Sequence, residues 1–414
     1  MKLAVVFQSS PFDRKGLFNA VHERVRHLLE QGGFEIDVYC LYTKDNALTR
    51  SVRHLQKVPY DKEVTYDGIT YHMLWYNFSI LDAVLCDRLH RKPLFLSRTL
   101  RKFSSLLKDY DCVSAHSYQG GLLAYDAFLR YGTRYYINWH GSDIHSHPWQ
   151  NSYQMSMTKL IAENALMNFY VGESLAGIGQ KIAPGSPSGV LSNGVSDKFY
   201  RFPDVRREGL RQRFGVRGRK TVIYAGNFYA VKNVLSLPEI FRGVIRKYSG
   251  NVTFWVVGDG KQRAQLLDGL YEMASSENVS IRSPWRFSRN GDSRVEIVLW
   301  GNARPEAMPL IMNCADVVVM PSRNEGSPLV CAEALRCGAA VVGASVCGIK
   351  DILDRDHLVD YGPDFCDGFS AKVVASLTDG KVQKLPSFLD WTKTAQKEAA
   401  FLKSCYLSGN VTEK

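Results

Sequence analysis

The chain alternates short runs of β-branched residues with amphipathic segments, and it does so in two successive series. The first series begins with the strand-like run KLAVVFQSS (residues 2–10). The second begins with TVIYAGNF (221–228) and continues with VTFWVVGDG (252–260) and CADVVVMPS (314–322). Between the two series, residues 198–220 form a basic stretch with turn residues that interrupts the alternation. Strand–helix alternation is typical of a parallel sheet with helices on both faces, so the sequence predicts two doubly wound α/β domains.

The predicted domain limits follow from this interruption. A chain of 414 residues is longer than one ordinary domain. We expect Rossmann-like domains over residues 1–197 and 198–385, and a final helix within 386–414 that packs back on the N-terminal domain. In such sheets, ligands bind beyond the carboxyl ends of the strands. The polar residues that follow the predicted strands are therefore candidates to line one cleft between the domains: Gly16, His116, His140–Asp143, Gly226, Asn227, Gly258–Gly260 and Glu325–Pro328.

Composition restricts the class of protein and its compartment. With 45% hydrophobic and 22% charged residues, the chain is expected to be globular. No apolar run reaches the roughly 18 residues that a membrane span needs, and the N-terminal MKLAVVF is too short for the core of a signal peptide. Nine cysteines without a CxxC pair favour free thiols in a reducing cytoplasm. We therefore expect a cytoplasmic protein.

The net charge of +11 indicates an anionic partner, such as phosphate, nucleic acid or membrane lipid. Nucleic acid is disfavoured, because the basic residues do not accompany a recognisable nucleic-acid-binding fold. One stretch, residues 84–108, carries seven Lys or Arg against a single Asp, interleaved with Leu and Phe. That composition suits a surface resting on anionic lipid headgroups, and it equally suits a solvated helix face. A peripheral position on the inner face of the membrane is therefore one candidate location.

The stretch RNEGSPLVCAEALRCG (residues 323–338) places Glu333 inside an otherwise almost wholly apolar helix. Ser327 and Pro328 predict the start of this helix, with the hydroxyl at the N-cap and the proline in the first turn, and Gly338 predicts its end. A carboxylate in an apolar setting costs on the order of 3 kcal/mol or more unless a partner meets it. From these residues alone, the partner is either a basic residue such as Arg336 or a hydroxyl-rich ligand.

The longer stretch PSRNEGSPLVCAEALRCGAAVVGASVCG (residues 321–348) resembles the signature of the retaining GT-B glycosyltransferases of glycosyltransferase family 4. In that signature a glutamate, seven residues and a second glutamate follow a buried strand, and here the two glutamates are Glu325 and Glu333. Further elements fall in the family order: WHGSD (139–143), SNGV (192–195), YAGNFYAVKN (224–233), VVGDG (256–260) and LWGN (299–302). The resemblance implies two Rossmann-like domains facing each other across a cleft, the N-terminal one for the acceptor and the C-terminal one for a nucleotide-sugar donor.

The resemblance also assigns roles around the two glutamates. It implies that Glu333 accepts hydrogen bonds from the ribose hydroxyls of the donor nucleotide and that Glu325 orients the donor sugar. Helix N-termini favour phosphate, so the backbone at the start of the helix is expected to hold the diphosphate. The residues of that backbone are Gly326, Ser327, Pro328 and Leu329.

Four more site residues come from the same resemblance. Lys232 is expected to neutralise the departing diphosphate, and His140 to lie beside the donor sugar. Gly16 is expected to let the backbone approach the diphosphate. Asn227 stands where most relatives carry an arginine, and it therefore removes one positive charge from the site.

No metal or other cofactor is expected beyond the donor itself. The spacing of His140, His145 and His147 would allow a metal site, but the run lacks a cysteine or helical spacing. The resemblance implies that the diphosphate is held without a metal, and a UDP-sugar is the commonest donor of such enzymes.

The implied reaction transfers a hexosyl unit, with retention of configuration, to a hydroxyl of a glycan or lipid-linked acceptor, in the synthesis of a cell-surface polysaccharide. Two alternatives stay open. One is a nucleotide-sugar epimerase or hydrolase on the same fold, which the spacing of the two glutamates disfavours. The other is a nucleotide-sugar-binding subunit with weakened catalysis, which the presence of Asn227 motivates.

Overall fold

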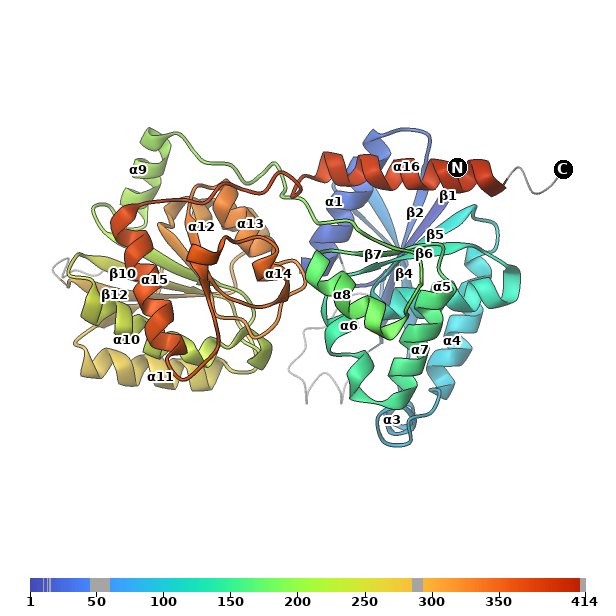
Figure 1. Cartoon of the computed structure of the whole chain (residues 1–414), viewed down its shortest axis with the longest axis horizontal. Coiled ribbons are helices and arrows are strands. Elements are labelled where there is room, and N and C mark those ends of the chain that lie inside the picture. The colour runs from blue at the N-terminus through green and yellow to red at the C-terminus, as the bar shows by residue number, and fades with distance from the viewer. Residues whose placement is uncertain (10, 13, 15, 45–59, 285–292, 410–414) are drawn as a thin grey trace. The chain divides into compact units, whose positions relative to one another are not determined.

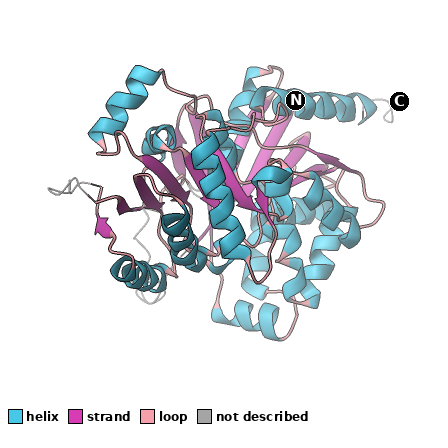
Figure 2. Ribbon diagram, turned by 60° about the vertical axis from the view of Figure 1, so that its left-hand side comes forward, coloured by secondary structure: helices cyan, strands magenta, loops and turns pink. Residues whose placement is uncertain are grey.

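The computed structural model describes residues 1–9, 11, 12, 14, 16–44, 60–284 and 293–409 of the 414-residue chain (Figure 1). These residues form two compact units. Unit 1 consists of Met1–Gly194 and Asp390–Lys414, and unit 2 consists of Val195–Leu389. Each unit contains one sheet with helices packed against it, as Figure 2 shows by colour. The predicted fold class, two Rossmann-like α/β domains, is confirmed.

The sheet of unit 1 has eight strands in the order β3-β4-β2-β1-β5-β6-β7-β8. Every neighbouring pair is parallel except β3 and β4, which form an antiparallel edge. Both central strands β5 and β6 are buried along their whole length, as expected for strands covered on two faces. The strands are β1 (Lys2–Gln8), β2 (Glu35–Thr43), β3 (Glu63–Tyr66), β4 (Ile69–Tyr76), β5 (Cys112–His116), β6 (Tyr135–Trp139), β7 (Asn168–Tyr170) and β8 (Ser188–Val190).

Alternate residues of β1 enter two different cores, because successive side chains of a strand point to opposite faces. Leu3, Val5 and Phe7 pack with α1 and α16 on one face, whereas Ala4 and Val6 pack with α5 and α7 on the other. The helices of unit 1 are α1 (Gly16–Glu30), α3 (Ile80–Ala83), the π-helical η1 (Val84–Arg88), α4 (Leu94–Ser104), η2 (Ser105–Leu107), α5 (Ser117–Tyr131), α6 (Ser142–His145), η3 (Pro148–Gln150), α7 (Ser152–Glu163), α8 (Glu173–Ile182) and α16 (Trp391–Gly409).

The sheet of unit 2 has seven strands in the order β11-β12-β10-β9-β13-β14-β15, and all of its pairs are parallel. Its two cores also lie on opposite faces: Phe254 of β10 enters one and Trp255 enters the other. The strands are β9 (Lys220–Ala225), β10 (Val252–Val257), β11 (Ser280–Arg282), β12 (Val295–Gly301), β13 (Val317–Met320), β14 (Ala340–Ala344) and β15 (Leu358–Val359). The helices are α9 (Asp204–Arg213), η4 (Ala230–Lys232), η5 (Val234–Ser236), α10 (Leu237–Lys247), α11 (Arg263–Ser276), η6 (Pro305–Ala307), α12 (Met308–Cys314), α13 (Leu329–Arg336), α14 (Cys347–Lys350), η7 (Arg355–His357) and α15 (Phe365–Asp379).

The chain passes between the units twice. We predicted limits after residues 197 and 385, and the units of the structure change after Gly194 and Leu389. Helix α16 lies on unit 1, where Thr394 donates a hydrogen bond to the carbonyl of Ser192 over 2.7 Å. The last five residues of the predicted final segment, 410–414, lie outside the described residues. Within the described residues, every helix is too short or too polar to cross a bilayer.

Candidate functional site

Glu325 and Lys232 meet in unit 2, although 93 residues separate them in the sequence. Glu325 follows β13, and it is buried, with 8% of its surface exposed. Its Oε1 lies 2.6 Å from the ammonium of Lys232, which ends the 3₁₀ turn η4 after β9. The same oxygen accepts a hydrogen bond from Ser322 over 2.7 Å. The charge of this buried carboxylate is therefore balanced by the lysine that the sequence analysis placed in the same site.

Backbone contacts fix the loop that carries Glu325. The N–H of Arg323 donates to the carbonyl of Val231 over 2.8 Å, which joins the loop to η4. The N–H of Gly348, in α14, donates to the carbonyl of Glu325 over 3.0 Å. A Cβ atom at Gly348 would lie only 1.9 Å from the carbonyl oxygen of Gly326, so only glycine fits there. Sequence reasoning missed Gly348, although it is the last residue of the stretch that carried the family resemblance.

Tyr361 is a second residue that the sequence did not reveal. It follows β15, and its hydroxyl donates to the carbonyl of Pro321 over 2.5 Å. The same hydroxyl accepts from the side chain of Asn233 over 3.4 Å, and the guanidinium of Arg323 lies 5.5 Å from its ring. Tyr361 thus connects the loop after β13 with the residue next to Lys232. No local sequence pattern marks it, because its partners come from two other loops.

Glu333 lies on α13, and unlike Glu325 it has no polar partner in the part of the chain that the structure describes. Its side chain is half-buried, and its helix neighbours Cys331, Ala332 and Ala334 are buried. No hydrogen bond or ion pair with another described residue meets its carboxylate. Burial raises the pKa of Glu333 to about 8.

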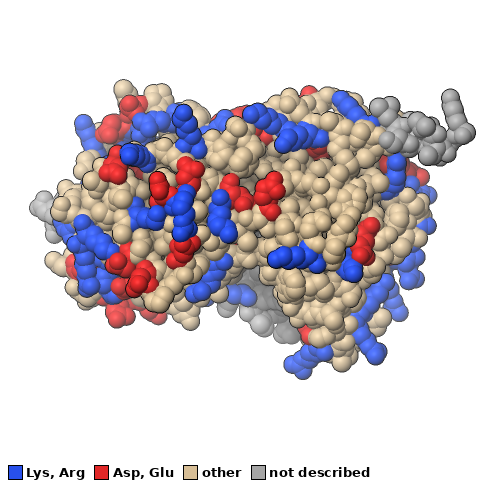
Figure 3. Space-filling view, in the orientation of Figure 1, with Lys and Arg blue, Asp and Glu red and all other residues tan. Residues whose placement is uncertain are grey.

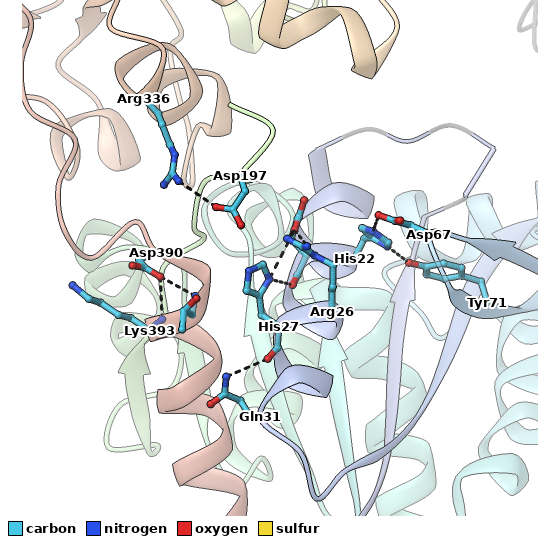
Figure 4. A network of polar contacts seen from close by, with 12 residues as sticks. His22, Arg26, His27, Gln31, Asp67, Tyr71, Asp197, Arg336, Asp390 and Lys393 are labelled. Carbon is cyan, nitrogen blue, oxygen red and sulfur yellow. Dashed lines mark hydrogen bonds and ion pairs between the residues drawn. The ribbon is translucent and has the colours of Figure 1, made fainter. Parts of the chain in front are cut away.

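The predicted alternative of an ion pair between Glu333 and Arg336 is wrong. The guanidinium of Arg336 donates to the carbonyl of Phe199 over 2.9 Å and to the carboxylate of Asp197 over 3.2 Å. Figure 4 shows Arg336 pointing toward Asp197. The carboxylate of Glu333 therefore has no polar partner among the described residues.

The start of α13 differs from the prediction by one residue. The helix begins at Leu329, and Pro328 occupies the N-cap position with extended backbone angles, so Ser327 is not the cap. Pro328 also has no N–H to offer a ligand. The N–H groups of Gly326, Ser327 and Leu329 have no acceptor among the described residues. Unpaired amides and the helix dipole make this end of α13 suitable for an anion. The predicted end of the helix is confirmed, because Gly338 follows it with a left-handed φ of 80°.

Asn227 lies in the loop after β9, between Tyr224 and Lys232. Its carbonyl accepts a hydrogen bond from the hydroxyl of Tyr224 over 3.1 Å. Its half-buried side chain has no hydrogen-bond partner among the described residues. Asn227 therefore shapes the loop through its backbone, and its amide group is free to meet a ligand.

His140 belongs to unit 1, at the carboxyl end of β6. Its backbone N–H and that of Gly141 both donate to the carboxylate of Asp143, the Gly141 bond over 2.7 Å. Its Nε2 lies 3.0 Å from Nδ1 of His116, at the end of β5. Burial, and then the nearby positive charge of Arg24, lower the pKa of His140 to about 3, so the ring is neutral at physiological pH.

The histidine spacing that would allow a metal site was not expected to hold one, and His147 has different surroundings from His140. The ring of His147 lies 4.2 Å from that of Tyr118, measured between centroids. Among the described residues, no group of three or more His, Cys, Asp or Glu side chains is arranged to hold a metal ion.

Gly16 is the exposed first residue of α1. A Cβ atom there would meet no other atom within 4 Å. No close approach within the chain therefore requires a glycine at this position. Gly16 and His140 belong to unit 1, whereas the other predicted site residues belong to unit 2.

Comparison with known sequences finds one family profile that matches part of unit 2. Residues 219–379 match the sequence profile described as Glycosyl transferases group 1. The putative teichuronic acid biosynthesis glycosyltransferase TuaC of Bacillus subtilis is 23% identical over 228 residues, which are 54% of this chain and 50% of that protein. The alpha-D-kanosaminyltransferase of Streptomyces kanamyceticus is 24% identical over 176 residues, 42% of this chain and 41% of that protein. The chain thus spans no more than half the length of these curated relatives.

Solved structures resemble the whole chain. The Anabaena protein HepE, in complex with UDP and glucose, superimposes with a TM-score of 0.66 at 15% identity, covering 98% of this chain and 100% of that one. The sucrose-phosphate synthase of Thermosynechococcus elongatus gives a TM-score of 0.67 at 14% identity, covering 100% of this chain and 98% of that one. At such identities the likeness establishes the fold. The chain therefore has the two Rossmann-like domains of the GT-B fold, and its residues 219–379 match the glycosyl transferases group 1 profile.

Proposed function

We propose that this protein is a retaining glycosyltransferase that moves a hexosyl unit from a nucleoside diphosphate sugar to a hydroxyl group of an acceptor. The observation that carries the proposal is the contact between Lys232 and Glu325 beside the unpaired amides of the β13–α13 loop. A cation and unpaired N–H groups together suit a diphosphate. A carboxylate in the same place suits the hydroxyls of the sugar.

The proposed mechanism places positive charge where negative charge develops. As the bond between the sugar and the diphosphate breaks, Lys232 and the amides of Gly326, Ser327 and Leu329 stabilise the leaving group. Glu325 orients the sugar, and Glu333 accepts hydrogen bonds from the ribose hydroxyls. The acceptor attacks the face from which the diphosphate departs, and an oxygen of the leaving phosphate takes its proton. This route needs neither a second carboxylate as nucleophile nor a metal ion.

A UDP-hexose is the proposed donor, and a glycan or lipid-linked sugar of the cell surface is the proposed acceptor. The donor is supported by the HepE complex with UDP and glucose. The acceptor is supported by the relative that is named for teichuronic acid biosynthesis. A screen of UDP-, GDP- and ADP-sugars by thermal shift tests the donor, because a ligand that binds the folded state raises the melting temperature.

The stereochemistry of the product tests the reaction. Proton NMR of the product formed from an α-linked donor should show an α-linkage, and transfer should continue in excess EDTA. A β-linked product would overturn the retaining mechanism. Loss of transfer in EDTA that manganese restores would overturn the metal-free mechanism and return attention to His140, His145 and His147.

A second candidate function rests on Asn227. A binding subunit with weakened catalysis would bind the nucleotide sugar but neither hydrolyse nor transfer it. Donor hydrolysis by the purified protein separates the two functions. Saturable UDP binding, with no hydrolysis or transfer to any glycan acceptor, would favour the binding subunit.

We propose further that residues 84–108 rest on an anionic membrane at the cytoplasmic face. All seven basic side chains of this stretch are exposed, and none forms an ion pair with another described residue. Figure 3 shows Lys and Arg gathered over the α3 and α4 part of unit 1. Large apolar side chains accompany them: Leu89 is 57% exposed, Leu94 52%, and Ile80 of the preceding helix 84%. Basic and apolar side chains exposed together are typical of a surface that binds at the lipid interface.

Vesicle binding tests the membrane surface. Each Lys or Arg near an anionic bilayer contributes about 1 kcal/mol, so changing Arg98, Arg101 and Lys102 to glutamate should abolish binding to phosphatidylserine vesicles. Wild-type binding should weaken as salt rises above about 0.15 M, where the screening length is about 8 Å. Donor hydrolysis should not change. Undiminished vesicle binding by the triple variant would contradict the proposal.

A further inference from the structure

A chain of buried polar side chains runs through unit 1 and ends at His140. β5 and β6 pair with Ser114 opposite Tyr136 and His116 opposite Asn138. In a parallel pair, these four residues share one face of the sheet. That face is covered by α1 and α16, because Tyr136 packs in the same core as Phe18 of α1 and Leu402 of α16. The interior next to α1 therefore holds polar groups that must satisfy one another.

The contacts form a continuous series. The guanidinium of Arg24, from α1, donates to Oδ1 of Asn138. Nδ2 of Asn138 lies 3.3 Å from the hydroxyl of Ser114, and that hydroxyl lies 3.2 Å from Nε2 of His116. Nδ1 of His116 lies 3.0 Å from Nε2 of His140. Except for the half-buried His140, all of these side chains are almost fully buried.

The series has a direction, because its first member can only donate. A guanidinium has no acceptor, so Asn138 must accept with its oxygen and donate with its nitrogen. Ser114 accepts that bond and has one proton to donate, to either of two neighbours, Nε2 of His116 or the hydroxyl of Tyr136. We assign the proton to Nε2 of His116. A neutral imidazole has one donor and one acceptor nitrogen. His116 therefore carries its proton on Nδ1 and donates it to Nε2 of His140.

Both histidines are neutral, as this reasoning requires. Burial, the neighbouring ring of His140 and the charge of Arg24 all hold the pKa of His116 well below its ordinary value. The pKa of His140 is lowered by burial and by Arg24. Since Nε2 of His140 accepts, its single proton must be on Nδ1. Nδ1 of His140 has no hydrogen-bond partner among the described residues. This nitrogen is not fully buried, so a ligand can reach it.

Helix α16 anchors the origin of the series. Nε of Arg24 lies 3.8 Å from Oε2 of Glu398, whose other oxygen accepts a hydrogen bond from Tyr136 over 2.6 Å. Arg24 also donates to the carbonyl of Leu191 over 3.2 Å. A buried arginine without a counter-charge would be strongly destabilising, so Glu398 allows Arg24 to remain in the interior.

We propose that Arg24, Asn138, Ser114 and His116 are positioning residues that hold His140 in the tautomer with its proton on Nδ1. His140 then presents its Nδ1–H as a fixed hydrogen-bond donor at the carboxyl end of β6. This inference rests on the proposed function only where it predicts an effect on transfer. The tautomer itself is a property of the free protein.

Nitrogen NMR of the free protein, with ¹⁵N-labelled histidine rings, tests the tautomer directly. Nδ1 of His116 and of His140 should each give the signal of a protonated ring nitrogen, and each Nε2 that of an unprotonated one. His140→Gln identifies the signals of His140. A wild-type His140 with its proton on Nε2 would overturn the proposal.

Asn138→Asp should reverse the series. The aspartate has the shape of asparagine but, when ionised, only accepts, and it places a second carboxylate beside Arg24 in addition to Glu398. Ser114 must then donate to the aspartate and accept from Nε2 of His116, and His116 must accept from Nε2 of His140. Both rings are expected to change tautomer. Unchanged ring signals in this variant would also overturn the proposal.

Ser114→Ala interrupts the series, and Thr158→Val is its matched control. Thr158 is a fully buried residue of α7 in the same unit, and its hydroxyl donates only to the carbonyl of Gln154. Both variants lose one buried hydroxyl, but only Ser114→Ala should alter the ring signals. If folding prevents its study, Asn138→Asp alone decides the question.

Kinetics separate this inference from the proposed function. Asn138→Asp and Ser114→Ala should lower kcat/KM for the donor by roughly 10- to 100-fold, if the effect is as large as that of losing the outer hydrogen-bond partner of a metal-bound histidine. Their affinity for UDP should stay unchanged, because the proposed nucleotide contacts are in unit 2. The predicted tautomer in a protein without transfer activity would contradict the proposed function alone. Transfer with the opposite tautomer would contradict this inference alone.

Discussion

Glu325 and Glu333 are eight residues apart, yet their carboxylates are in opposite states. Glu325 is buried and has both a lysine and a hydroxyl within hydrogen-bond distance. Glu333 is half-buried and has no polar partner among the described residues. Burial raises the free-energy cost of a charged carboxylate at both positions, but only Glu325 has compensating partners among the described residues. The charge of Glu325 is therefore compensated before any ligand binds, whereas that of Glu333 is not.

This difference separates two kinds of site residue. Glu325 and Lys232 form a preorganised pair whose members depend on each other before any substrate arrives. Glu333 is a desolvated carboxylate without a partner in the described chain, and a hydrogen-bond donor would stabilise its ionised form. Removing Lys232 is therefore expected to harm the free protein, whereas removing the charge of Glu333 is expected to stabilise it.

Lys232→Met should reduce kcat by about 10²–10³-fold, because it removes a fixed charge that stabilises the leaving diphosphate. It should also destabilise the free protein by about 2 kcal/mol, less than for a fully buried pair, because the lysine is partly exposed. Urea unfolding gives the stability, and initial rates give kcat.

The double variant Lys232→Met/Glu325→Gln is the control for the pair. It should lose less stability than the sum of the two single variants, because no unbalanced charge is left. Additive losses would show that the two side chains do not interact, and the contrast with Glu333 would fail.

Glu333→Ala should weaken nucleotide binding by about 1–3 kcal/mol, through loss of hydrogen bonds to the ribose. Binding to the ionised carboxylate also predicts a pH dependence. Because the pKa of Glu333 in the free protein is raised to about 8, affinity should fall as the pH drops below 8, by at most tenfold per unit. Calorimetry with UDP over pH 6–9 measures both effects. Equal affinities of wild type and Glu333→Gln at every pH would contradict the ribose assignment.

Glu333→Gln should make the free protein more stable at high pH. The pKa of Glu333 is about 8 when folded and 4.5 ordinarily, so the folded state binds the proton more tightly. In the wild type, protonation of Glu333 therefore makes its largest contribution to the free energy of unfolding below pH 4.5. This contribution is lost as the pH rises through 8. The variant should melt several degrees above wild type at pH 9, and at about the same temperature at pH 5. A constant difference across this range would mean that Glu333 keeps its ordinary pKa.

The sequence analysis named both glutamates and Lys232 as candidate site residues, but it did not predict which groups pair with their charges. Glu325 and Lys232 were identified separately, because a contact across 93 residues leaves no local pattern. Arg336 is next to Glu333 on the same helix but bonds to Asp197, since tertiary contacts override sequence proximity. Gly348 has no helix or turn signal, and its need for glycine exists only once the carbonyl of Gly326 is in place.

Local signals predicted the elements better than their ends. The β-branched runs gave the strands of both sheets, since strands buried on two faces are apolar throughout. The start of α13 was placed one residue early, because a Ser-Pro pair fits either of two adjacent cap positions. The network behind His140 was not predicted at all, because its members are spread over α1, β5, β6 and α16.

Asn227→Arg should have the smallest effect. It tests whether unit 2 already supplies enough positive charge to stabilise the departing diphosphate. The side chain of Asn227 has no partner among the described residues, so an arginine would not break an existing hydrogen bond there. If Lys232 and the amides of α13 leave the diphosphate short of positive charge, the arginine should raise kcat a few-fold. Affinity for the intact donor should change little, because the leaving-group charge develops mainly in the transition state. Steady-state kinetics separate kcat from KM, and Asn227→Gln controls for side-chain size without charge. A gain seen with both variants would assign the effect to shape, and no gain with arginine would mean that Lys232 and the amides suffice.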